Sequence, residues 1–168
     1  TIANGFPMTC VLGTNKVMED SSSSFISSTF FTDRIGFVAA LKTLEVMEQN
    51  KSWEIITELG NYYKKKVNDV FAKTDFEINW SGMPSLIGYS VKSKQWLYLK
   101  TFIIEICLDF GYLHGCLFYP SLAHSKSDID DFTKKLLEII IEIESKGIDH
   151  IVNEIGKGVC HSTFKRLN

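Results

Sequence analysis

Two neighbouring hydroxyl side chains stand just before a predicted helix and could bind an anion. Ser28 and Thr29 precede Asp33, after which apolar residues recur at three- and four-residue spacing. Hydroxyl groups and the unpaired backbone N–H groups at the start of a helix are good donors to phosphate or carboxylate. These groups could contact an anion, but on the residues alone the favoured interpretation is that Thr29 forms or caps a turn.

The cysteines and histidines do not form a metal-binding pattern. Cys10, Cys107, Cys116 and Cys160 include no C-x-x-C pair, and no histidine stands at ligand spacing from them. We therefore predict no metal site, and reduced thiols in the interior of a cytoplasmic protein. His124 could act as an acid–base group, but its place between a strand and a helix start favours a bond to the local backbone.

Composition excludes some classes of partner. The chain has 168 residues and a net charge of −2, with Arg34 and Arg166 as its two arginines. A nucleic-acid surface needs clustered basic residues, so we expect no nucleic-acid partner. The apolar run from Leu136 to Ile143 is broken by glutamates, so we predict a buried helix there and no association with a membrane.

The elements that position these residues follow from periodicity and turn chemistry. Helices are predicted at 33–48, at 52–71 and at 95–109. Ser52 is the expected N-terminal cap of the second helix, and Gly111 is the expected C-terminal cap of the third. A Ser127–Asp130 capping box should begin a long fourth helix, and a short helix is expected after Gly147. Strands are predicted at 9–12, 76–80 and 85–91, with one or two more between 112 and 123.

This order of elements predicts an α+β lobe that begins near residues 49–52. Its small sheet is expected to be mainly antiparallel and covered by helices. One helix should supply a core stripe, which consists of Ile129, Phe132, Leu136, Ile140 and Ile143.

Three segments carry a resemblance to a known family. They are Ala3-Asn4-Gly5-Phe6-Pro7, the run from Ser28-Thr29-Phe30 to the alanine-containing stretch Gly36–Glu45, and Leu122–Asp130. Together they resemble the C-terminal half of a class III aminotransferase, an enzyme that uses pyridoxal 5'-phosphate (PLP). The likeness extends over about residues 1 to 145 and is especially close to glutamate-1-semialdehyde aminomutase.

The resemblance implies a fold, a cofactor and a site. The fold is α/β, the C-terminal part of a PLP-dependent transferase of fold type I, with the end of the large domain at 1–50, a small α+β domain at 51–146 and a tail at 147–168. The cofactor-bearing lysine is expected immediately before Thr1, so no catalytic residue is expected within the chain. Thr29, with Ser28, would bind the PLP phosphate of the partner subunit in a homodimer.

The activity implied is transfer of an amino group between a small amine or amino acid and a carbonyl partner. Two alternatives remain: a 2,1-aminomutase of the glutamate-1-semialdehyde type, and a non-catalytic α+β interaction domain whose motifs are chance. The chain departs from the family at Thr32-Asp33-Arg34, where Asn-Pro usually opens the helix. Arg34 could contact a substrate or a partner's acid, or lie on the surface, and the substrate is not readable from the chain.

Overall fold

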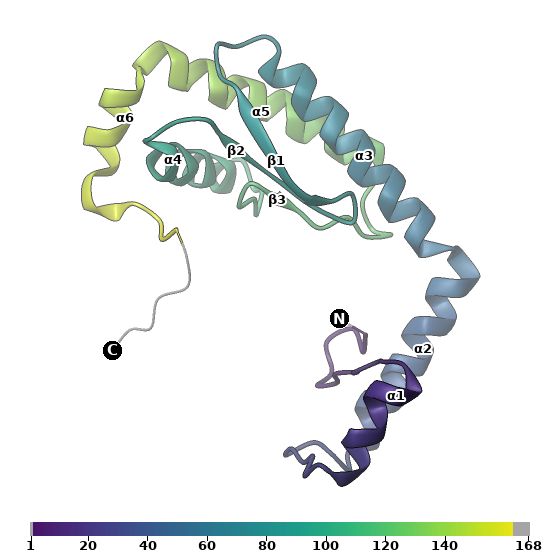
Figure 1. Cartoon of the computed structure of the whole chain (residues 1–168). Helices are drawn as coiled ribbons and strands as arrows, with labels where there is room; N and C mark the ends of the chain where they lie inside the picture. The colour runs from purple at the N-terminus through teal and green to yellow at the C-terminus, as the bar shows by residue number, and fades with distance from the viewer. Residues whose placement is uncertain (1, 163–168) are drawn as a thin grey trace. The chain divides into compact units, whose positions relative to one another are not determined.

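The computed structural model describes residues 2–162 and divides into two compact units (Figure 1). Unit 1 is Thr1–Ser52 and unit 2 is Trp53–Asn168. Unit 1 carries the candidate anion site, and unit 2 carries the predicted α+β lobe. No helix among residues 2–162 combines the length and apolarity needed to cross a bilayer.

Unit 1 consists of a loop-rich segment followed by one long helix. Helix α1 (Asn15–Met18) leads into a 3₁₀ helix (Glu19–Ser23), and α2 spans Arg34–Asn50. Asp33 caps α2, since its Oδ1 accepts a hydrogen bond from the Ile35 N–H at 2.9 Å. This cap satisfies one of the unpaired donors at the helix start, which explains why the helix begins where the sequence predicts.

The strand predicted at 9–12 is absent, so that prediction was wrong. Residues 9–14 have no regular structure, and Val11 and Leu12 are 78% and 88% exposed. A β-branched run forms a strand only beside another strand, and none lies next to this run among the described residues of unit 1.

Helix α3 (Ser52–Phe71) follows α2 after one residue. Lys51 ends α2 in the left-handed conformation, with φ 47° and ψ 47°. The prediction that Ser52 caps α3 was wrong, because Ser52 is itself the first helical residue and its buried hydroxyl has no hydrogen-bond partner. The face of α3 that contains Leu59, Tyr63 and Val67 is buried.

The sheet in unit 2 has three antiparallel strands in the order β1-β2-β3. They are β1 (Ile78–Met83), β2 (Leu86–Val91) and β3 (Leu117–Phe118). The strand predicted at 76–80 begins two residues later than expected and continues to Met83, which pairs with Leu86. The small antiparallel sheet predicted from the sequence is thus confirmed.

Helix α4 (Trp96–Asp109) ends at a glycine, as predicted. Gly111 has φ +81°, its N–H donates to the Leu108 carbonyl at 2.9 Å, and the Tyr112 N–H donates to the Cys107 carbonyl at 2.8 Å. These bonds satisfy the last carbonyl groups of the helix, which a left-handed glycine permits.

Helix α5 (Lys126–Lys146) opens with a capping box that lies two residues before the predicted one. Ser125 and Asp128 form it: the Asp128 N–H donates to Ser125 Oγ at 3.2 Å, and the Ser125 N–H donates to Asp128 Oδ2 at 2.7 Å. The Ser127–Asp130 box was therefore wrong. Ser125 and Ser127 each precede an aspartate by three residues, so the spacing fits both boxes equally well.

Two short helical segments complete unit 2. Helix α6 (Ile148–Ile155) follows Gly147 and contacts α4 and α5, and a 3₁₀ helix spans Gly156–Gly158. The backbone N–H of Cys160 then donates to Thr101 Oγ1 on α4 at 2.9 Å.

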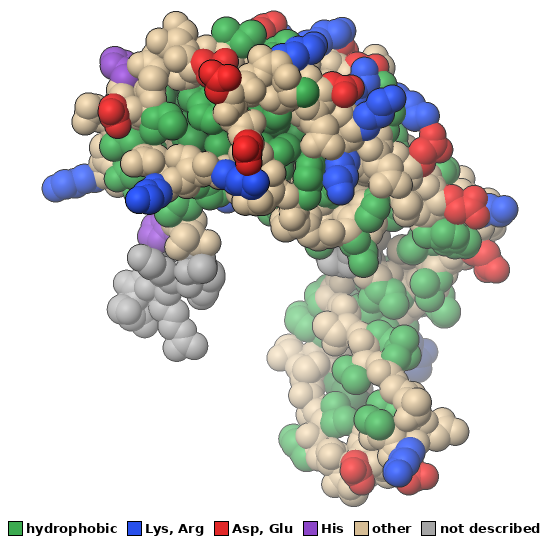
Figure 2. Space-filling model, turned by 45° about the horizontal axis from the view of Figure 1, so that its top comes forward, with side chains coloured by type: hydrophobic (Ala, Val, Ile, Leu, Met, Phe, Trp, Pro, Cys, Tyr) green, Lys and Arg blue, Asp and Glu red, His purple; other side chains and the backbone are tan. Residues whose placement is uncertain are grey.

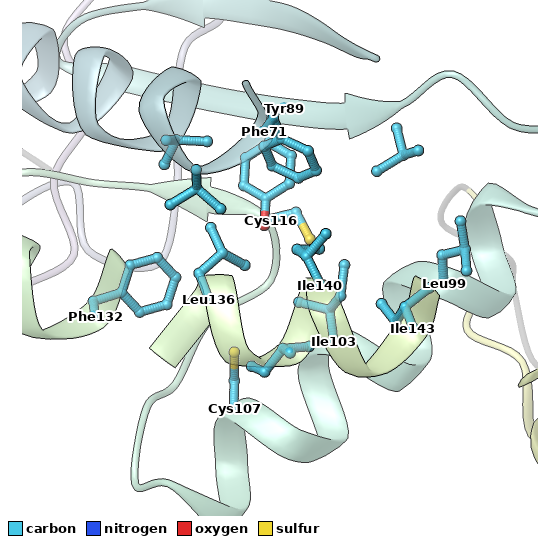
Figure 3. Packing of buried hydrophobic residues seen from close by; sticks show 14 of the residues in the cluster. Phe71, Tyr89, Leu99, Ile103, Cys107, Cys116, Phe132, Leu136, Ile140 and Ile143 are labelled. Atoms are coloured by element: carbon cyan, nitrogen blue, oxygen red, sulfur yellow. The ribbon is translucent and has the colours of Figure 1, made fainter. Parts of the chain in front are cut away.

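The core of unit 2 lies where the sheet meets the helices (Figure 3). Tyr89 and Cys116 come from the sheet and the loop before β3, and Ile103 comes from α4. All five members of the predicted α5 stripe are buried. Removing these side chains from water supplies most of the drive to fold this unit.

Candidate functional site

Ser28 and Thr29 lie in an exposed turn directly before α2. The Phe31 N–H donates to the Ser28 carbonyl, and the Asp33 N–H donates to the Phe30 carbonyl, each at 3.1 Å. Within residues 2–162, the hydroxyl groups of Ser28 and Thr29 have no hydrogen-bond partner. The turn therefore presents two hydroxyl donors to whatever binds there.

The start of α2 itself is less available to an anion. Asp33 already occupies the cap position and adds a carboxylate there. An anion would therefore bind to the turn at Ser28 and Thr29, which precedes the helix, and not to the first turn of the helix itself. Arg34 is exposed at the first position of α2 and could supply a positive charge next to this turn.

The structure brings the first two sequence motifs together. Gly36 in α2 is buried against the loop that holds Asn4-Gly5-Phe6-Pro7, and a Cβ at Gly36 would lie 2.7 Å from the Pro7 carbonyl oxygen. In that loop Ala3 is buried, and Asn4 and Gly5 both have positive φ, at 44° and 108°. Only a glycine lets the helix approach the loop this closely, so the two motifs form one structural feature.

The surface of unit 1 is unusually apolar. Phe25, Phe30, Phe31, Val38 and Leu41 are all more than half exposed. Figure 2 shows such hydrophobic side chains over this unit. A gathering of exposed apolar side chains indicates a surface that another protein segment or subunit covers. The apolar stripe predicted for α2 exists, but among the described residues only its Gly36 and Ala40 are buried.

The third motif has an architectural role in unit 2. His124 Nδ1 accepts a hydrogen bond from the Ser121 N–H at 3.1 Å, and its ring lies edge-on to Phe118 at 5.1 Å. The prediction that His124 serves the local backbone is therefore confirmed. The capping box lowers the pKa of Asp128, chiefly through hydrogen bonds from Ser125.

The loop at residues 82–85 is fixed against α3. A Cβ at Gly60 would lie 1.8 Å from the Pro84 carbonyl oxygen, so the hairpin end packs onto the helix backbone. Met83 remains 63% exposed at this end. The geometry assigns no chemical role to the loop.

One unusual titratable group was missed by the sequence reasoning. His114 is 8% exposed, and burial lowers its pKa from 6.5 to about 4. Its Nε2 lies 3.5 Å from the Tyr89 hydroxyl, and its ring centroid is 4.6 Å from that of Phe132. No sequence signal marks His114, because Tyr89 and Phe132, which pack against it, lie far from it in the sequence.

The thiols differ from the prediction in one respect. Cys107 and Cys116 are buried, and burial raises their pKa values to about 11 and about 12. Such thiols stay protonated and inert near neutral pH. Cys160 is partly buried, but Cys10 is exposed, so the prediction of four interior cysteines was wrong for Cys10.

Thr1 and residues 163–168 lie outside the described part of the chain. The predicted position of a lysine directly before Thr1 therefore has no structural description. The cofactor-binding candidates, Ser28 and Thr29, lie in unit 1, and the architectural His124 lies in unit 2.

A comparison with solved structures finds a protein of the same fold. The FumI protein of Sphingopyxis sp. MTA144, solved in its PLP internal aldimine form, matches with a TM-score of 0.76 and 18% identity. The match covers 86% of this chain and 36% of that one. It confirms the predicted fold class: this chain shares the fold of the matched part of a PLP-dependent protein.

Curated relatives are aminotransferases. One is the 3-aminobutyryl-CoA aminotransferase of Cloacimonas acidaminovorans (strain Evry), 30% identical over 84 residues, which are 49% of this chain and 20% of that protein. Another is the acetylornithine aminotransferase of Methanocaldococcus jannaschii, 24% identical over 149 residues, which are 85% of this chain and 36% of that protein. The chain thus spans between a fifth and little more than a third of the length of these relatives.

A family model settles what the partial matches suggest. The model of the class-III aminotransferases matches residues 1–140, which include both turn motifs of unit 1 and nearly all of the α+β lobe. A likeness produced by chance in three short motifs would not extend over this length. The chain belongs to the class-III aminotransferase family.

Proposed function

We propose that the intact protein is a PLP-dependent aminotransferase, which moves an amino group from a small amine or amino acid to a carbonyl partner. Family membership supports this proposal, as do the names of the relatives. The observation that carries it is the turn at Ser28 and Thr29, whose hydroxyl groups are exposed and have no partner among residues 2–162. These donors suit a phosphate group.

Each part of the site has a definite task in this proposal. When bound, the pyridoxal ring supplies the electron sink for reaction at the substrate's α-carbon. Thr29 Oγ1, assisted by Ser28, would donate a hydrogen bond to the cofactor phosphate and so hold it in position. The cofactor-bearing lysine stands directly before Thr1, and the loop at Asn4-Gly5-Phe6-Pro7 holds that end of the chain against α2 through the contact at Gly36.

The proposal includes a homodimer in which Thr29 binds the cofactor of the other subunit. The exposed apolar side chains of unit 1 support it, because Phe30 and Phe31 flank Thr29 and are 52% and 58% exposed. A partner surface laid over these rings would also exclude water from the phosphate contact. We place this dimer in the cytoplasm, where unpaired cysteines such as Cys10 persist.

The decisive variant is Thr29→Ala in the full-length protein. Loss of a hydrogen bond to a charged phosphate should weaken cofactor binding by about 1–3 kcal/mol, or roughly 5- to 150-fold. Thr32→Ala is the matched control, because Thr32 is an exposed threonine in the same turn and should not affect the cofactor. Titration of the cofactor-free protein with PLP, followed by visible absorption, gives both dissociation constants. Equal affinities for wild type and Thr29→Ala would remove Thr29 from the site.

A product assay separates intermolecular transfer from the aminomutase alternative. When the carbonyl partner is withheld, a transaminase stops after the first half of its cycle, because the enzyme keeps the amino group and has no acceptor to pass it to. Sustained turnover of a single substrate without an acceptor would replace transamination by intramolecular amino transfer. Full-length protein that binds no PLP would instead favour a non-catalytic domain.

A further inference from the structure

Arg34 is the one arginine in the part of the chain that the structure describes, and it is the first residue of α2. Its side chain is exposed and forms no hydrogen bond, ion pair or ring contact within residues 2–162. The next cation along the helix differs in this respect, since Lys42 Nζ lies 2.8 Å from Glu45 Oε1. The five N–H donors of the Arg34 guanidinium are therefore available to a ligand.

The surroundings of Arg34 on α2 are apolar. Side chains three and four residues apart lie on the same face of a helix, and Phe37 and Val38 stand at these positions after Arg34. Both are more than half exposed, as are Phe31 and Ile35 on either side of Arg34 in the sequence. Arg34 is thus a single positive charge within an exposed apolar face.

Covering this face would make the lone charge costly. A surface that packs on Phe37 and Val38, as the partner subunit does under the proposed function, would also remove Arg34 from water. Burial of an unpaired charge costs several kcal/mol, so the covering side must bring an oxyanion to the guanidinium. Arginine is enriched at protein interfaces and binds carboxylate or phosphate through two parallel hydrogen bonds.

The direction of the Arg34 side chain favours the anion that Thr29 would bind. Side chains of a helix incline toward its N-terminus, so a side chain at the first position extends toward the turn that precedes the helix. Two successive backbone hydrogen bonds, each 3.1 Å long, fold residues 28–33 into a compact turn that carries the free hydroxyl groups of Ser28 and Thr29. A phosphate has enough acceptor oxygens for a hydroxyl and a guanidinium together.

The neighbouring carboxylate does not already serve as the partner of Arg34. Asp33 Oδ1 accepts a hydrogen bond from the Ile35 N–H at 2.9 Å, and no ion pair joins Asp33 to Arg34. The aspartate is therefore used as a helix cap, and the guanidinium next to it is left for another anion.

We propose that the Arg34 guanidinium binds, together with the Thr29 hydroxyl, the phosphate of the cofactor held by the partner subunit. This inference rests on the proposed function and adds a charged contact to it. The family usually has proline at this position, and proline offers no such donor.

PLP and pyridoxal are suitable probes, because pyridoxal lacks the phosphate. Each is titrated into the cofactor-free, full-length protein and followed by visible absorption. Arg34→Gln should raise the dissociation constant of PLP about 10- to 100-fold, as loss of hydrogen bonds from a charged group predicts, and should leave that of pyridoxal unchanged. An unchanged affinity for PLP, or an equal loss for pyridoxal, would overturn the assignment.

Two further variants separate the contact from a general effect of charge. Arg34→Lys keeps the charge but loses the planar pair of donors, so its loss of PLP affinity should be smaller than that of Arg34→Gln. Lys42→Gln removes a positive charge about two turns farther along α2 and should leave PLP affinity unchanged. A loss in Lys42→Gln equal to that in Arg34→Gln would show that only the net charge of the helix matters, and the proposal would be wrong.

A carboxylate of the partner subunit is the competing anion. If Arg34 bound it, Arg34→Gln would weaken the cofactor-free dimer in sedimentation experiments and would lower the affinities for PLP and pyridoxal alike, which would refute the phosphate contact. The Thr29→Ala protein separates this inference from the proposed function. Weakened PLP binding in Thr29→Ala beside wild-type binding in Arg34→Gln would refute the role of Arg34 alone, whereas wild-type protein that binds no PLP would refute the proposed function itself.

Discussion

Replacing His114 by phenylalanine should change how the stability of unit 2 depends on pH. Burial lowers the pKa of His114 from 6.5 to about 4 in the folded protein. The unfolded chain therefore binds a proton at this residue more tightly than the folded chain does. As the pH falls through the window from 6.5 to 4, protonation favours the unfolded state, and the free energy of unfolding decreases.

The magnitude follows from the size of the pKa shift. Each pKa unit corresponds to about 1.4 kcal/mol, so the full loss for His114 is about 3 kcal/mol below about pH 4. At about pH 5, where the unfolded histidine is charged and the folded one is mostly neutral, the loss already reaches about 2 kcal/mol. The phenylalanine variant has no ionisable group at this position, so its free energy of unfolding should not decrease by this amount as the pH falls.

Urea unfolding of both proteins at about pH 7.5 and about pH 5 measures the difference. Tryptophan fluorescence reports on the correct part of the chain, since Trp53, Trp80 and Trp96 all belong to unit 2. Carboxylates titrate equally in both proteins, so their contributions cancel. His150→Phe is the control variant, because it removes an exposed histidine by the same substitution. If wild type and His114→Phe lose the same free energy between the two pH values, His114 does not titrate as its burial implies.

Two further predictions concern the frame of unit 2. Ser125→Ala should lower the free energy of unfolding by about 1 kcal/mol through loss of the α5 cap, whereas Ser127→Ala should change it by less than about 0.5 kcal/mol, both by urea titration. Gly60→Ala should lower the free energy of unfolding by about 1–3 kcal/mol, because the new methyl group would overlap the Pro84 carbonyl. A melting temperature equal to that of the wild type would contradict the close approach of Pro84 to α3. Gly115→Ala, with no heavy atom within 4 Å of the new group, serves as its control.

Periodicity located the long helices because each of them repeats its apolar spacing over several turns. The stripe on α5, from Ile129 to Ile143, needs only the 3.6-residue period to be recognised, and all its predicted members are buried. The end of α4 was equally readable, since Gly111 adopts the positive φ that favours glycine after a helix. Such signals are local, so the sequence alone contains them.

Other features depended on contacts between distant residues. The run at 9–12 has the composition of a strand but no neighbouring strand among the described residues, and composition cannot reveal a missing neighbour. His114 is buried because Tyr89 and Phe132 close over it from β2 and α5. The candidate phosphate site was found through the family resemblance, because Thr29 by itself has the appearance of an ordinary turn residue.

The two units differ in what holds their structure together. Unit 2 has its own core, in which helices and sheet bury a continuous set of apolar side chains. Unit 1 fixes Gly36 against Pro7 but leaves the rings beside Thr29 half exposed. A hydroxyl that must meet a phosphate oxygen needs a rigid setting, because small displacements weaken a hydrogen bond steeply. The rings of Phe30 and Phe31 can give that rigidity only when another surface packs against them. Under the proposed function, the partner subunit provides this surface, so one contact would both bury the apolar face of unit 1 and position Thr29 at the cofactor.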